Sequence, residues 1–117
     1  MAQTIRRKDI QKVLIGWQKG KLTAKEVHAW AEDRYAAYNW DPEDDVVNEV
    51  LGRLDLLNMT LTTPEDIPAF LQTLSYSSDC LQQAVEYLEG YESEVDIEQR
   101  KRACAHDPLY APFCGQA

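Results

Sequence analysis

The chain has 117 residues, of which 44% are hydrophobic and 27% charged, a composition typical of a single globular domain. A chain of this length buries roughly two thirds of the surface that its unfolded form exposes, so it can fold without metals or disulfides. The cysteines, Cys80, Cys104 and Cys114, are odd in number and widely spaced, which indicates free thiols rather than a disulfide framework. The spacing leaves open whether Cys104 and Cys114 pair.

The net charge of −8 is distributed unevenly. Residues 1–25 carry seven Lys or Arg and one Asp, whereas residues 32–98 carry seventeen Asp or Glu and two Arg. The acidic middle of the chain should be repelled by nucleic acid and attracted to a basic protein surface. The alternative, that the charge serves solubility alone, stays open.

The first residues, MAQTIRRKDIQKVLIGW, contain neither the apolar core nor the cleavage site of a signal peptide. Nothing in the sequence approaches the ~20 consecutive apolar residues that cross a bilayer. We therefore expect a cytoplasmic protein that does not contact membranes.

Two helices are predicted at the start of the chain. The first carries an apolar stripe at helical spacing, Ile10, Val13, Leu14 and Trp17, and Gly20 is placed to end it. The second begins at a capping box, Thr23 with Glu26, and its stripe runs from Val27 through Trp30, Ala31, and Arg34 or Tyr35 to Tyr38. The short link between the two predicts an antiparallel hairpin.

A third helix is predicted to begin at Asp41 as the cap, with Pro42 in its first turn, and to continue to about Leu57. Pro64 and Pro68 then predict an irregular turn followed by a short helix that ends near Leu74.

The last long helix is predicted from Ser77 or Ser78, and the pattern resumes after a fresh cap at Asp96, with Ile97, Lys101 and Cys104 on one face. No alternating run predicts a strand. The sequence thus predicts an all-α fold: a compact bundle of about five helices over residues 1–106. An extended tail is expected over residues 107–117, with Tyr110 and Phe113 available to hold it against the bundle.

Two places are candidates for binding. His28 with Trp30 and Tyr38 could line a pocket between helices, although His28 and Glu32 alone are too few ligands for a metal. The acidic stretch of the last long helix could attract a basic protein partner through a set of five residues, Glu86, Tyr87, Glu89, Tyr91 and Glu92. The alternatives are an ordinary partly exposed histidine and a solvated helix face.

Patterns of catalysis and cofactor binding are not found in the sequence. There is no nucleophile elbow and no glycine-rich phosphate loop. The spacing of Cys104, His106 and Cys114 does not match a zinc site, and the acids from Asp41 to Asp45 lack the glycine and distal glutamate of a calcium loop. We therefore expect no enzyme, no metal and no cofactor.

The stretch from Gly20 to Ala31, G-x-L-T-x-x-E-x-x-x-W-A, resembles a pattern in small bacterial proteins of the immunity-protein type, which neutralise toxins. The resemblance implies an acidic helical inhibitor of a basic toxin or nuclease, and no functional residue carries over from it. The leading hypothesis is therefore a non-catalytic protein-binding module. The alternatives are a small-molecule or metal-binding regulator and a homo-oligomer, in its simplest form a homodimer.

Overall fold

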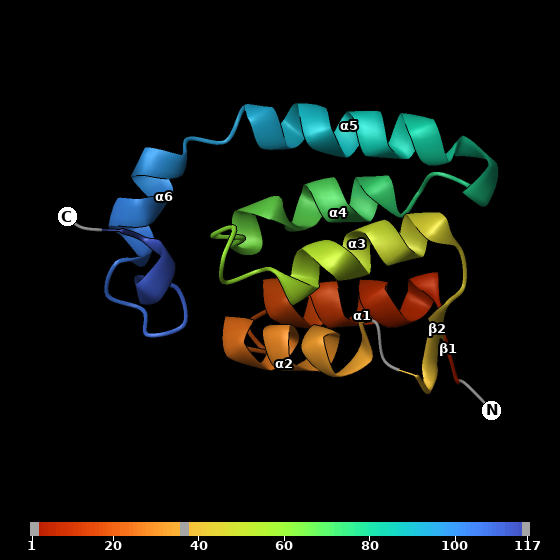
Figure 1. The fold of residues 1–117 in the computed structure, drawn as a ribbon, viewed down its shortest axis with the longest axis horizontal. Helices are drawn as coiled ribbons and strands as arrows, with labels where there is room; N and C mark the ends of the chain where they lie inside the picture. Colours follow the sequence, from red (N-terminus) through yellow and green to blue (C-terminus); the bar gives the residue numbers. More distant parts are fainter. Residues whose placement is uncertain (1–2, 36–37, 116–117) are drawn as a thin grey trace.

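The structure, a computed structural model, describes residues 3–35 and 38–115. The predicted all-α fold is confirmed, and Figure 1 shows the helices stacked in layers with successive long helices running in opposite directions. The described residues form six α-helices: α1 (Arg7–Gln18), α2 (Ala24–Arg34), α3 (Asp45–Asp55), α4 (Ile67–Thr73), α5 (Leu81–Ser93) and α6 (Ile97–Cys104).

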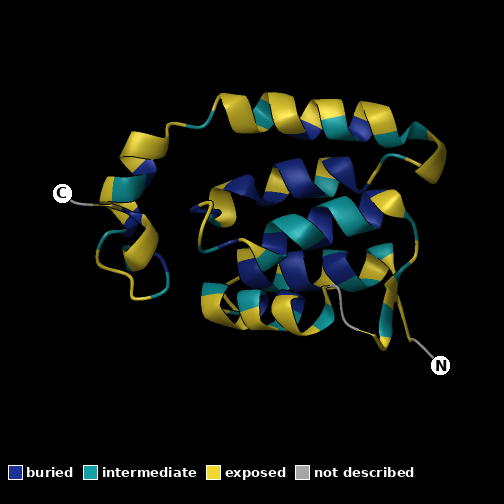
Figure 2. Ribbon diagram, in the orientation of Figure 1, coloured by how far each residue is buried: buried dark blue, intermediate teal, exposed yellow. Residues whose placement is uncertain are grey.

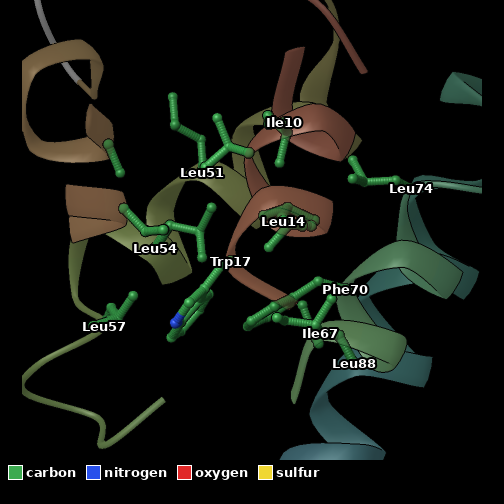
Figure 3. Close-up of a cluster of buried hydrophobic side chains, with 14 of the residues drawn as sticks. Ile10, Leu14, Trp17, Leu51, Leu54, Leu57, Ile67, Phe70, Leu74 and Leu88 are labelled. Atoms are coloured by element: carbon green, nitrogen blue, oxygen red, sulfur yellow. The ribbon is translucent and has the colours of Figure 1, made fainter. Parts of the chain in front are cut away.

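The hydrophobic core lies around α1, which contacts α2, α3 and α4, while α5 covers α3 and α4. Each layer contributes fully or almost fully buried side chains, such as Leu14 from α1, Leu51 from α3, Phe70 from α4 and Leu88 from α5 (Figure 3). Truncating one of these leucines to alanine costs about 2–5 kcal/mol, because the neighbours only partly fill the cavity. The core therefore supplies most of the stability that holds the surface sites in place.

The predicted hairpin of α1 and α2 is confirmed. Thr23 caps α2 by accepting a hydrogen bond from the Glu26 amide, while the Glu26 carboxylate accepts one from the Thr23 amide. The link before it turns at Gly20, whose φ of +78° lies in the left-handed region that favours glycine. The helix ends at Arg34, however, so Tyr38 lies beyond it and does not continue its stripe.

The prediction that the chain has no strand was wrong. Residues Gln3–Ile5 form β1 and residues Trp40–Pro42 form β2, and the two strands pair in parallel with Gln3 opposite Trp40 and Ile5 opposite Pro42. Each strand is too short to show an alternating pattern, and the pairing joins segments far apart in the chain. Local sequence therefore carried no signal of the sheet.

The predicted start of α3 was also wrong. Asp41 and Pro42 belong to β2, and the cap is Asp44, whose carboxylate accepts a hydrogen bond from the Val47 amide at 3.0 Å. Asp44 is also held by Arg7, whose guanidinium donates to it at 2.8 Å. Several carboxylates in this stretch are suited to cap a helix, and the pairing with β1 decides which of them does.

Residues 107–115 fold back rather than extending, so the expected extended tail was wrong there, and residues 116–117 of that prediction lie outside the described residues. A short 3₁₀ helix, η3 (Ala111–Phe113), follows α6 at one end of the molecule (Figure 1). Tyr110 is buried and its hydroxyl donates to the Thr62 carbonyl at 2.6 Å, as expected for a residue that holds the tail, while Phe113 remains exposed. The buried face of α6 carries Arg100 and Cys104, not the predicted Ile97.

In the described residues, none of the helices combines the length and the apolar character needed to cross a membrane.

Candidate functional site

A groove of about 970 Å³ lies between α1, the link to α2, and strand β1. Its apolar lining includes Ile15, Leu22, Trp30 and Trp40. The link can fold close to α1 because Gly16 has no side chain: a Cβ there would meet the Leu22 side chain at 3.1 Å. The backbone reinforces this approach, since the Lys21 amide donates to the Gly16 carbonyl at 2.8 Å.

The groove is strongly basic, although the whole chain is strongly acidic. Five cations line it, Lys8, Lys12, Lys19, Lys21 and Arg34, against one carboxylate, Asp9. The Asp9 carboxylate has a structural partner of its own, because it accepts a hydrogen bond from the Arg6 amide at the start of α1. The four lysines are exposed, so their charges are free to meet an anion at the mouth of the groove.

Arg34 is the most constrained of these cations. Its guanidinium carbon lies 4.6 Å from the ring centroid of Trp30 and 4.6 Å from that of Trp40. It also donates a hydrogen bond to the Trp30 carbonyl at 3.0 Å. Stacking on aromatic rings fixes the plane of a guanidinium while leaving other N–H groups available. The same nitrogen that donates to the Trp30 carbonyl lies 3.5 Å from the exposed carboxylate of Asp33, so the second terminal nitrogen of Arg34 is the one left for a ligand.

All three residues of strand β1 line the groove, and one edge of this strand is not paired with β2. The Gln3 amide donates to the Asn39 carbonyl and the Ile5 carbonyl accepts from the Glu43 amide, so both residues direct their backbone groups toward β2. Successive residues of a strand point their backbone groups to opposite sides. The amide and carbonyl of Thr4 therefore face away from β2, at the outer edge of β1, and Thr4 is one of the residues that line the groove.

The structure does not bring the predicted pocket residues together. The Nε2 atom of His28 donates to the Asp55 carbonyl at 2.9 Å, which directs the imidazole toward α3. Burial raises the pKa of the neighbouring Asp55 carboxyl. Trp30 lines the basic groove instead, and Tyr38 is fully exposed and outside its lining.

The predicted acidic surface on α5 is only partly free. Glu86, Tyr87 and Glu89 are exposed on the outer layer of the molecule, where α5 shows mostly yellow in Figure 2. Glu92 instead pairs with Arg53 of α3 at 3.3 Å, and the Tyr91 hydroxyl donates to Asp66 at 2.5 Å. Two of the five predicted contact residues thus hold α5 against the rest of the fold.

A buried ionic network joins α5 and α6 to the segment before α4, and sequence reasoning missed it. Arg100 donates to both carboxylate oxygens of Asp66 and to the Leu61 carbonyl at 3.1 Å. The hydrogen bonds with Asp66 raise the pKa of Arg100, while burial raises that of Tyr91. An arginine on the apolar spacing of α6 was the one available signal. The network fixes the C-terminal part of the chain to the segment before α4.

The described residues offer no obvious metal centre, since no three of their His, Cys, Asp or Glu side chains converge. Cys104 and Cys114 are buried free thiols in this structure, and Cys80 is a partly exposed one.

The comparisons with known proteins leave the basic groove as the main guide to function. No family model, no curated protein and no solved structure matches the chain. The signal that could have located the groove was present in the sequence as the excess of basic residues in positions 1–25. The Trp30–Arg34 spacing of four residues, which places both on one helix face, pointed to the same region.

Proposed function

We propose that this protein is a non-catalytic binding module whose basic groove receives an anionic segment of a partner. The observation that carries the proposal is the position of Arg34, stacked on Trp30 and Trp40 in a groove that four lysines also line. The whole chain has a net charge of −8, whereas the groove is locally positive. Anionic groups are therefore attracted to the groove and repelled by the acidic faces.

The arrangement suits recognition because its parts have separate roles. The exposed lysines steer an anion toward the groove, an effect that salt screens. The tryptophans supply rigid apolar contact area, which contributes to affinity at little cost in conformational entropy. Arg34 can then meet a carboxylate or phosphate with a charge-assisted hydrogen bond from its second terminal nitrogen. This module is proposed to act in the cytoplasm.

A charge-reversal experiment tests the proposal. Binding of a fluorescent oligoglutamate peptide is measured by anisotropy at low and at moderate salt. The double variant Lys12→Glu, Lys21→Glu should weaken binding about tenfold at low salt. Lys25→Glu with Arg102→Glu is the matched control, because it changes the net charge equally and both residues are exposed but do not line the groove. Equal losses in both variants, or no binding by the wild-type protein, would contradict the proposal.

A second candidate function is capture of a basic partner by the outer face of α5, which is the immunity-type role suggested by the sequence. The observation in its favour is an aromatic pair: the rings of Tyr76 and Tyr87 lie 6.2 Å apart beside Glu86. Such a pair offers rigid contact area, and the carboxylates of Glu86 and Glu89 would steer a basic surface.

The two candidates are separated by a pull-down from native lysate at two salt concentrations. Glu86→Lys with Glu89→Lys should release a basic partner while leaving oligoglutamate binding unchanged. Glu92 is kept intact in this variant because its ion pair with Arg53 holds α5 to α3. A basic partner retained equally by the variant would remove α5 from the interface.

A further inference from the structure

Beside its cations, the groove has an unpaired strand edge, the outer edge of β1. In the part of the chain that the structure describes, the sheet contains β1 and β2 alone, so no strand pairs with the other side of β1. Thr4 is exposed there and lines the groove. An unpaired strand edge is a ready template for an extended segment of another chain.

The cations lie where such a segment would pass. Helix α1 begins two residues after β1, and its early turns carry Lys8 and Lys12 into the lining of the groove. Trp40, opposite Gln3 in the sheet, also lines it. Side chains of an added strand alternate between two faces. A segment with acidic and aliphatic residues in alternation would thus offer carboxylates to the lysines and apolar groups to the tryptophans.

We propose that the occupant of the groove is an extended acidic peptide segment that pairs with β1 as a third strand, through the backbone amide and carbonyl of Thr4. The inference rests on the proposed binding function and specifies its partner and mode. Charge complementarity and the free strand edge together favour a peptide. A single-stranded nucleic acid could satisfy the cations, but it has no backbone that pairs along a strand.

Peptides with methylated backbones provide the first test. A short peptide alternating glutamate and valine is compared with two versions, one N-methylated at the glutamates and one at the valines. Both versions keep the charge, but in a strand each loses the N–H groups of one edge only. Strand pairing predicts that one version binds about tenfold more weakly while the other binds like the parent. Equal binding of both versions would overturn the pairing.

A backbone variant of the protein provides the second test. Thr4→Pro removes the amide at the outer edge of β1, whereas the bonds of Gln3 and Ile5 to β2 remain. Binding of the alternating peptide should weaken about fivefold. Thr4→Val keeps the amide and should bind like the wild type. The melting temperatures of both variants show whether the fold is intact, and unchanged affinity in a folded Thr4→Pro protein would contradict the proposal.

The outcomes separate this inference from the function on which it rests. If both methylated peptides bind equally and remain sensitive to Lys12→Glu with Lys21→Glu, the binding of anionic segments in the basic groove is supported and the strand pairing is contradicted. If no acidic peptide binds, both the anion-binding function and the strand pairing are contradicted. A short oligothymidylate that binds more tightly than the peptide and displaces it would overturn a peptide as the occupant.

Discussion

Arg100 donates to Asp66 at 2.6 Å and 2.8 Å, although 34 residues separate the two in the chain. Both side chains are nearly inaccessible to water, with 10% and 5% of their surface exposed. The ion pair lies where the segment before α4 meets α6, and Tyr91 of α5 adds its hydroxyl to the same carboxylate. One carboxyl group thereby positions two helices.

The first prediction concerns this pair. Asp66→Ala should lower the free energy of unfolding by about 3–5 kcal/mol, because it removes the buried counter-ion of the Arg100 guanidinium and leaves only the exposed carboxylate of Glu65, 3.5 Å away. Urea unfolding followed by circular dichroism measures the change. The double variant Asp66→Leu, Arg100→Met removes both charges and should recover most of the loss. A double variant less stable than Asp66→Ala would contradict the explanation.

Alkaline pH should destabilise the protein. Burial raises the pKa of both Tyr91 and Tyr110 above the ordinary value of 10.0. Above that value the unfolded chain loses these protons while the folded chain retains them, so stability falls as pH rises. Urea unfolding between neutral and strongly alkaline pH should show this fall, and Tyr91→Phe with Tyr110→Phe should make the dependence shallower. Tyr38→Phe, at a fully exposed position, is the control.

Mutation distinguishes Asp44, which caps α3, from Asp41, which the sequence predicted as the cap. Asp44→Ala should cost about 1–2 kcal/mol, because it removes the acceptor of the Val47 amide. The loss of its ion pair with Arg7 adds to this cost. Asp41→Ala should have a much smaller effect on unfolding, since Asp41 is exposed in β2. Equal effects of the two substitutions would mean that Asp44 does not cap the helix.

Two glycines should respond in opposite directions to alanine. Gly90 lies inside α5, where an added Cβ would meet no atom within 4 Å beyond the adjoining residues and the backbone of the helix itself, so Gly90→Ala should stabilise the protein by about 0.5–1 kcal/mol. Gly20 adopts a φ of +78°, where alanine is strained, so Gly20→Ala should destabilise it. Melting temperatures of the two variants check both signs.

The sequence by itself determined most of the helical framework. The stripe of Ile10, Val13, Leu14 and Trp17 is buried in α1 as predicted, and the Thr23 box starts α2. The cap at Asp96, which accepts from the Gln99 amide, was also predicted correctly. These features depend on contacts within a few turns of one helix, so the local spacing of residues is sufficient to specify them.

Only the tertiary structure decided the sheet, the buried ion pair and the groove. Asp41 and Asp44 are comparable caps in sequence, and the pairing of β2 with β1 selects Asp44. The excess of basic residues near the start of the chain did not show that Lys8 and Lys12 of α1 line the same groove as Arg34 and Trp40. Each of these features joins segments distant in the chain, and the free energy that fixes them comes from packing that forms only when the helices assemble.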